Sequence, residues 1–185
     1  MRQTIRHTAR LIAIHVLVLT GVAHGAQSCD STITSTTPTT RFTVAKDGTV
    51  VDTATGLTWK QCTEGQTYSA DTSTCSGTAD TYNWQQALQR AQAVNQGKGG
   101  NAAGYNDWRV PNVKELRSIV EQACREPAVD PSNRLFPLTR SAFYWSSSPA
   151  AGTVGQAWGV DFTDGSASLQ SMTEPSYLRL VRGGL

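Results

Sequence analysis

The sequence predicts an α+β fold in which two helices pack on an antiparallel sheet. Two segments, Tyr82 to Asn95 and Asn112 to Cys124, carry apolar residues at the three- and four-residue spacing of a helix. Short alternating segments separated by turn dipeptides lie before and after them, which is typical of antiparallel strands. The chain has no internal repeat and no alternation of strands with helices, so a parallel βαβ sheet is not expected.

The first residues, 1–25, have the composition of a secretory signal peptide. Arg2, Arg6 and Arg10 precede an apolar run from Leu11 to Leu19, and Ala23-His24-Gly25 supplies small residues where a signal peptidase cleaves. The alternative is an uncleaved anchor, but the run is about half of the roughly 20 residues that a membrane span needs. We therefore expect export to the periplasm, the cell surface or the medium, with no membrane span after cleavage.

Removal of this segment changes the charge and the chemistry of the chain. It takes away three of the 16 basic residues and none of the 14 acidic ones, which leaves 13 against 14 and a net charge near −1. That balance offers no basic patch for nucleic acid. All three histidines also lie in the segment, so the mature chain lacks the residue that Ser-His-Asp and Cys-His catalysis require. We expect neither an enzyme nor a cofactor.

Four cysteines remain, Cys29, Cys62, Cys75 and Cys124. An even number in an exported chain predicts disulfides, and four cysteines allow three pairings. We favour Cys62–Cys75, which closes a local loop rich in Thr, Ser and Gly, together with Cys29–Cys124, which ties the N-terminal arm to the end of a helix. The alternative is a zinc site of four thiolates. It is disfavoured because the spacings of 33, 13 and 49 residues match no zinc motif.

The N-terminal part of the mature chain is expected to be an arm followed by hairpins. Residues 26–42 are rich in Ser and Thr and cannot build a core alone, which predicts an extended arm. Alternation around the turns Asp47-Gly48 and Thr55-Gly56 predicts short antiparallel strands from residue 41 to residue 59. Residues 63–80 should form a loop held by the local disulfide. A single domain is expected over residues 43–185.

Two helices are expected in the middle of the chain. Thr81 or Asn83 can cap the first, and a glycine-rich stretch ends it. The second begins at Asn112, three residues before Glu115, which is the arrangement of a capping box. Trp108 lies on the short extended segment before this cap, and we expect it to bury against both helices.

The last third of the chain predicts four strands of one antiparallel sheet. Phe143 to Ser147, Gln156 to Phe162 and Ser166 to Met172 are the first three, with a turn at Asp164-Gly165 between the second and third. Tyr177 to Val181 alternates apolar and polar residues and is expected to be the fourth. The N-terminal hairpin is available to join this sheet.

Six short segments of the chain, taken in order, carry a family resemblance. They read TGLTWKQC, YNWQQAL, YNDWRVPNVKEL, FYWSSSP, AWGVDFTDGS and YLRLVRGG. Over about Val50 to Gly184 the chain resembles the Lcl C-terminal domain-like family, named for a bacterial collagen-like surface adhesin. The resemblance implies a C-type-lectin-like fold, with two helices packed on a curled antiparallel sheet with long loops. The chain departs from the founding adhesin because it has no Gly-X-Y collagen stalk.

The resemblance implies surface attachment, with polysaccharides as candidate ligands, and aromatic side chains offer faces on which sugar rings can stack. The candidate ligand-binding residues are Tyr144, Trp145, Trp158, Asp161, Asp164, Tyr177 and Arg179. The two tryptophans lie inside strands and have a core position as their alternative, and Asp164 has a hairpin turn. Calcium held by Asp161 and Asp164 is disfavoured, because calcium needs six or more oxygen ligands and the segment has few acids.

Two other classes of function remain open. One is a structural or assembly module of the envelope or of a pilus that binds protein. The other is a carboxylate-based enzyme that acts on polysaccharide, for which Glu121, Glu126, Asp161 and Asp164 are the candidates. Such an enzyme needs two carboxylates about 5–10 Å apart, and no pair stands out. We favour a secreted or cell-surface, non-catalytic module that recognises glycan or polysaccharide as adhesins do.

Overall fold

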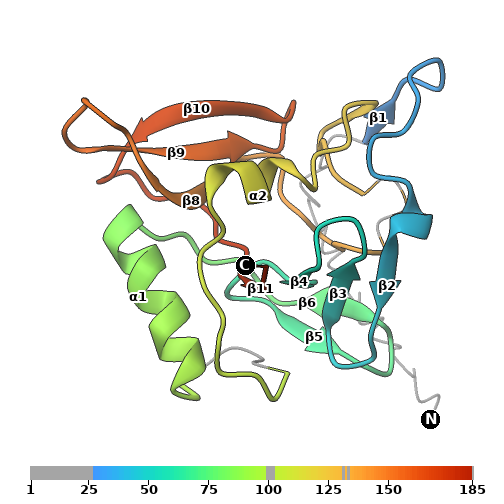
Figure 1. Cartoon of the computed structure of the whole chain (residues 1–185). Coiled ribbons are helices and arrows are strands. Elements are labelled where there is room, and N and C mark those ends of the chain that lie inside the picture. Colours follow the sequence, from blue (N-terminus) through green and yellow to red (C-terminus); the bar gives the residue numbers. More distant parts are fainter. Residues whose placement is uncertain (1–26, 99–102, 131, 133, 185) are drawn as a thin grey trace, which may run out of the picture.

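The computed structural model describes residues 27–98, 103–130, 132 and 134–184. The expected signal peptide lies outside these residues. The fold is mixed, with short, mostly antiparallel strands in several sheets and few helices, so the predicted α+β class is confirmed. Figure 1 shows the two larger sheets on either side of the short helix α2 (Val113–Arg117). Within the described ranges, no helix has the length and apolar character to cross a bilayer.

Three of the predicted C-terminal strands form a sheet of their own. The strands are β8 (Phe143–Pro149), β9 (Gln156–Asp161) and β10 (Ser166–Ser171), in the order β10-β9-β8. β9 and β10 pair without interruption from Asp161 opposite Ser166 to Gln156 opposite Ser171. The pairing of β8 with β9 shifts register between Trp145 and Pro149. Three adjacent strands of the expected kind are therefore present.

The fourth predicted strand does not join them, which corrects the expectation of one four-stranded C-terminal sheet. The last strand is β11 (Val181–Gly183), and it pairs with β4 (Leu57–Lys60). Together with β3 (Thr49–Asp52) and β2 (Phe42–Val44) these strands form a second sheet, in the order β11-β4-β3-β2. Residues 177–180 instead connect the two sheets, because Tyr177 hydrogen-bonds to β8 through its backbone and the Leu180 carbonyl accepts from the Lys60 amide in β4.

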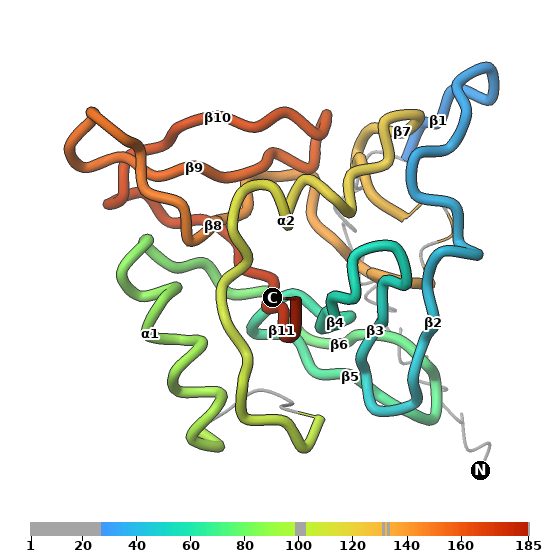
Figure 2. The backbone as a smooth tube through the Cα atoms, viewed as in Figure 1, coloured from blue at the N-terminus to red at the C-terminus, as the bar shows by residue number. Residues whose placement is uncertain are grey.

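The loop predicted over residues 63–80 contains a hairpin. Its strands are β5 (Thr67–Ser69) and β6 (Thr74–Ser76), and the disulfide Cys62–Cys75 closes it. The second disulfide, Cys29–Cys124, joins β1 (Ser28–Cys29) to β7 (Cys124–Arg125). Both bridges therefore have the predicted pairing. Figure 2 shows the arm beside the turn that carries β7; a 3₁₀ turn (Thr39–Arg41) then leads into β2.

Both helices begin where the sequence predicts, but the second is much shorter than predicted. Asn83 caps α1 (Trp84–Asn95) and Asn112 caps α2, each in a capping box. α2 ends at Arg117, whereas the apolar spacing predicted a helix to Cys124. After Arg117 the Glu121 amide donates to Ala128 O at 3.0 Å instead of to the carbonyl four residues back. A tertiary contact thus replaces the helical hydrogen bond that local spacing favoured.

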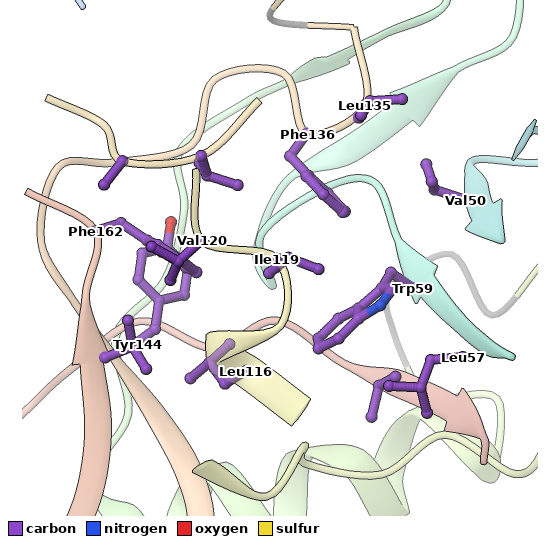
Figure 3. Packing of buried hydrophobic residues seen from close by; sticks show 14 of the residues in the cluster. Val50, Leu57, Trp59, Leu116, Ile119, Val120, Leu135, Phe136, Tyr144 and Phe162 are labelled. Atoms are coloured by element: carbon purple, nitrogen blue, oxygen red, sulfur yellow. The ribbon is translucent and has the colours of Figure 1, made fainter. Parts of the chain in front are cut away.

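The buried apolar residues form two clusters on opposite faces of the three-stranded sheet. The larger cluster lies between α2 and the two main sheets and includes Trp59, Leu116, Ile119, Phe136 and Phe162 (Figure 3). The smaller cluster lies between α1 and the other face, and it contains the buried Trp108 of the segment that precedes α2. The side chain of Asn95, at the end of α1, donates a hydrogen bond to the Trp108 carbonyl and accepts one from the Trp108 amide, at 2.8 Å each.

Candidate functional site

Three of the seven predicted ligand-binding residues are fully buried. Tyr144, Trp145 and Arg179 have no exposed surface, so they belong to the interior and not to a surface that a ligand reaches. Trp145 donates its indole N–H to Tyr82 O at 2.8 Å. This placement corrects the expectation for these three side chains, since the alternation of apolar and polar residues that suggested them does not show which face of a strand is covered.

Arg179 is a buried cation held by neutral oxygens. Its guanidinium donates to the backbone oxygens of Lys60 and Gln61. It also donates to Thr139 Oγ1 at 2.7 Å and lies over the ring of Phe136, 4.7 Å from the centroid. Burial lowers the pKa of Arg179. The side chain therefore fixes the loop before β8 against the strand β4, and through Thr139 it reaches the surface described below.

Tyr144 links the same network to Tyr177. Its hydroxyl lies 3.0 Å from Thr63 Oγ1 and accepts from the Arg140 amide at 3.1 Å. Burial raises the pKa of Tyr144, so the phenol is neutral at physiological pH. The rings of Tyr144 and Tyr177 lie 5.5 Å apart at 32°. The buried tyrosine thus supports the partly exposed one from inside.

Two of the predicted acids act as turn residues. Asp161 Oδ1 accepts from the Thr163 amide at 2.8 Å, and Asp164 Oδ1 accepts from the Ser166 amide at 2.9 Å. The hydrogen bonds from Ser166 lower the pKa of Asp164. In the described part of the chain no group of three or more His, Cys, Asp or Glu comes together in a way that could hold a metal ion.

Trp158 and Tyr177, the two remaining candidates, are half-buried, and Tyr177 packs against the larger cluster, which lies on the same face of the three-stranded sheet as Trp158. Trp158 is on the face that packs against α2, because it lies two residues from Val160, whose side chain is in the larger cluster. Tyr177 lies beside β8, with its amide donating to Phe143 O at 3.1 Å and its carbonyl accepting from Trp145 N at 3.0 Å. The structure therefore does not bring the seven residues together into one site.

Tyr177 lines two adjoining clefts, each of about 300 Å³. We call them together the Tyr177 groove. The first cleft is lined by Ala142, Phe143, Gln170, Glu174, Pro175, Ser176 and Tyr177. The second is lined by Glu126, Pro127, Thr139, Arg140, Ser141, Ala142 and Tyr177. The groove thus combines two partly exposed aromatic rings with amide, hydroxyl, carboxylate and guanidinium groups.

The polar groups of the first cleft are already ordered. Gln170 Nε2 donates to Ser176 Oγ at 2.6 Å, which leaves the amide oxygen of Gln170 as an acceptor. Ser176 is also fixed by backbone hydrogen bonds of 2.9 Å in both directions with Tyr82. Glu174 is exposed at the rim. A ligand with hydroxyl groups would therefore meet an amide and a carboxylate without extensive rearrangement of this wall.

Phe143, Gln170, Glu174 and Ser176 were not predicted as site residues. A signal for Phe143 exists in the sequence, because a glycine inside a strand often marks the close approach of another group. Gly159 is that glycine: a Cβ added to it would lie 2.3 Å from the Phe143 ring. Gln170, Glu174 and Ser176 carry no such signal, since ordinary polar residues in a hairpin and a turn look alike whether or not they line a cleft.

The two larger clefts lie away from the predicted residues. One, of about 700 Å³, runs between α1 and the start of α2 and includes Trp108, Arg109 and Glu115. Arg109 is paired there with both oxygens of Glu115 at 2.7 Å. The other, of about 650 Å³, lies beside β2 and includes Phe42, Val44 and Arg134. Size alone therefore does not select the Tyr177 groove; it is distinguished by its pair of accessible aromatic rings and its ordered polar wall.

Comparison with known proteins connects the chain to a family. A search of curated proteins finds no match. The Lcl C-terminal domain family matches residues 48–182. This range contains both main sheets except β2 and the last residue of β11, and it contains the whole Tyr177 groove. The match covers most of the 185 residues of the chain. The chain therefore belongs to the Lcl C-terminal domain family.

Proposed function

We propose that this protein is an exported, adhesin-like binding module of C-type-lectin-like architecture that recognises glycan or polysaccharide in the Tyr177 groove. The observation that carries the proposal is the position of Tyr177, whose half-buried ring forms part of both clefts. Family membership supports a surface module of this kind. The two disulfides fit an oxidising compartment outside the cytoplasm.

The chemistry of the groove suits sugars. Tyrosine presents an apolar ring face together with a polar hydroxyl, and a sugar ring likewise has an apolar face and hydroxyl edges. Gln170 and Glu174 can hydrogen-bond such hydroxyls in the first cleft, and Thr139 and Ser141 can do so in the second. Each cleft is at the lower end of the roughly 300–1,000 Å³ range of small-molecule sites, which favours short stretches of a glycan chain.

We also propose that binding proceeds without catalysis. Of the four acids considered for hydrolysis, Glu121 accepts hydrogen bonds with both oxygens from the N-terminal arm, and Asp161 and Asp164 hold the hairpin turn. Of these four acids, Glu126 is the one that lines the groove. Incubation of a bound oligosaccharide with the protein, followed by analysis of the products, checks this point; appearance of shortened chains would contradict it.

A glycan array followed by titration tests the binding proposal. We expect the secreted protein to bind at least one polysaccharide class, and Tyr177→Ala to weaken that binding by roughly tenfold or more. Gln170→Ala should weaken it without disturbing the core. The matched control is Tyr105→Ala, an aromatic residue that contacts Trp108 and Arg182 away from the groove. Absence of binding to any glycan, or equal losses in Tyr177→Ala and Tyr105→Ala, would contradict the proposal.

A further inference from the structure

The outer edge of β10 differs from the other strand edges of the two main sheets. The outer edge of β8 is covered, because the Trp145 amide donates to Tyr177 O and the Ser147 amide donates to Pro111 O. The edge of β11 pairs with Arg109 through two backbone hydrogen bonds. β2 is three residues long and lies between Arg41 and Lys46. Shortness, charge and cover are the usual protections of a sheet edge.

In the described structure β10 is neither short nor covered, and its nearest charges, Asp164 and Glu174, lie outside the strand. It is six residues long, reads SASLQS, and contains no charge and no proline. Its pairing with β9 is regular over all six residues, so no bulge twists the edge away. Figure 2 shows it at the border of its sheet, with no described segment beyond it. A long, uncharged, regular edge is a template for pairing with another strand.

The hydrogen-bond register shows which backbone groups face outward. The Met172 amide donates to Gly155 O at 2.8 Å, so this residue bonds toward β9. Because inward- and outward-bonding residues alternate along an antiparallel strand, Ser168 and Gln170 also bond inward. Ala167 and Leu169 then direct their N–H and C=O groups away from β9, and they have no backbone partner on that side among the described residues.

The side chains of β10 match a second copy of the same strand. If two copies pair antiparallel about a two-fold axis at Leu169, that leucine faces its own copy and Ser168 faces Gln170 of the second chain. Leu169 is 36% exposed and lies opposite the half-buried Trp158 in the β9 register. An apolar row would thus continue through both sheets on one face. On the other face, each Ser168 hydroxyl can donate to the Gln170 amide oxygen of the second copy.

We propose that two copies of this chain associate through their β10 edges, so that the two three-stranded sheets become one six-stranded antiparallel sheet. Because the contact is two-fold, each copy uses its single exposed β10 edge and the assembly closes as a dimer. The interface is a single strand pair with few side chains, so the dimer is weak and concentration-dependent. Two binding modules held together gain avidity at a surface that displays repeated ligands. The inference rests on the backbone edge of β10; Gln170 is the one β10 residue that also lines the Tyr177 groove.

Sedimentation equilibrium of the secreted protein with intact disulfides tests the association. We expect a monomer–dimer equilibrium, and Leu169→Lys should raise the dimer dissociation constant by roughly tenfold or more, because it places two ammonium groups side by side at the axis. The matched control is Val44→Lys, which puts the same charge at a 45% exposed apolar position on the edge strand β2 and should leave the dissociation constant unchanged. In this register Asp164 of one copy lies near Glu174 of the other at each end of the interface. Because these two carboxylates repel each other and salt screens the repulsion, added salt should strengthen association.

A cross-linking experiment tests the register without relying on affinity. Residues that face each other as a hydrogen-bonded pair have Cα atoms about 5.5 Å apart, which is within the range for a disulfide. Leu169→Cys should therefore form a covalent dimer on mild oxidation, whereas Val154→Cys, a fully exposed position in the β8–β9 turn, should do so much more slowly.

A protein that is monomeric up to its solubility limit, or Leu169→Cys that cross-links no faster than Val154→Cys, would overturn the proposal. Loss of the dimer in Val44→Lys would also overturn it. Glycan binding by a strictly monomeric protein would leave the groove proposal standing alone.

Discussion

Glu121 is the residue that holds the N-terminal arm to the domain. Its side chain accepts from the hydroxyl groups of Ser35, Thr36 and Thr37 and from the amides of Thr36 and Thr37, at 2.6 to 3.2 Å. Burial alone would raise the pKa of Glu121, but these hydrogen bonds outweigh it and lower the pKa to about 2. The carboxylate is therefore ionised in the folded state at physiological pH, and it holds in place an arm that has few apolar residues.

This carboxylate makes stability depend on acid. Its folded pKa of about 2 lies below the ordinary value of 4.5, so the stabilisation is complete above about pH 4.5 and is lost as the pH falls toward 2. We expect Glu121→Gln to lower the free energy of unfolding at pH 7 by roughly 3 kcal/mol and to flatten the pH dependence in that window. Urea unfolding at several pH values measures both. The exposed Asp71→Asn is the control, and an unchanged profile for Glu121→Gln would contradict the role.

Arg179 and Arg182 offer a test of the buried cation. Replacement of Arg179 by Met leaves the buried carbonyls of Lys60 and Gln61 without their donor, so we expect a loss of about 3 kcal/mol or more. Arg182 instead forms an exposed pair with Asp107 at 2.7 Å, and Arg182→Met should cost about 1 kcal/mol or less. Thermal unfolding compares the two. Equal losses would show that Arg179 has no more than a surface role.

The sequence alone could not separate these two arginines. They are three residues apart in YLRLVRGG, and both follow an apolar residue in an alternating pattern. Which one is buried depends on the path of residues 177–180 between the sheets, a tertiary feature. The same limit explains why Tyr144 and Trp145, adjacent in one strand, are both buried: their sheet is covered on both faces, by α2 and by α1.

At the scale of elements, the helix starts were predictable because they depend on local chemistry. In each capping box the Asn side chain accepts from the backbone near the start of the helix, and the Gln86 or Glu115 side chain returns the contact. The end of α2 was not predictable from spacing, because the chain beyond Arg117 bonds to residues near Ala128 and to the arm. The hairpin β5–β6 was missed for a related reason, since its Thr- and Ser-rich strands have no apolar alternation.

The capping box of α2 should make a measurable contribution to the free energy of unfolding. Asn112 accepts from the amides of Lys114 and Glu115 at 2.9 Å, and in a five-residue helix these bonds satisfy much of the first turn. We expect Asn112→Ala to lower the free energy of unfolding by about 1 kcal/mol, within the 0.5–2 kcal/mol range for such caps. Lys114→Ala, at an exposed position of the same turn, should change it little. A guanidinium titration of the three proteins decides whether the cap matters.

At the scale of the whole molecule, the two disulfides differ greatly in how far apart in the sequence their cysteines lie. Cys29–Cys124 spans 95 residues and Cys62–Cys75 spans 13. In the chain-entropy account the long bridge restricts the unfolded chain more, by about 4–5 kcal/mol against about 3 kcal/mol. The pairing was predictable from locality, because once Cys62 pairs with Cys75 the two remaining cysteines are Cys29 and Cys124. The splitting of the strands into two sheets was not, because it depends on contacts between distant segments.

Removal of each bridge in turn tests that account. We expect the double replacement of Cys29 and Cys124 by Ser to lower the melting temperature more than that of Cys62 and Cys75, and to expose the arm to protease cleavage near residues 30–37. Differential scanning calorimetry and limited proteolysis measure the two effects. The reverse order of melting temperatures, or an arm that stays protected, would show that local packing around the hairpin outweighs the long bridge.

The pairing of β11 with β4 has a consequence for the newly made polypeptide. β4 pairs with β3 close by in the chain, but its second neighbour is β11. The four-stranded sheet therefore cannot be completed until residues 61–180 have been made. If the chain is exported as proposed, we expect this sheet to be completed only after residues 181–183 have crossed the membrane, so that the disulfide-bonded domain forms late and outside the cytoplasm.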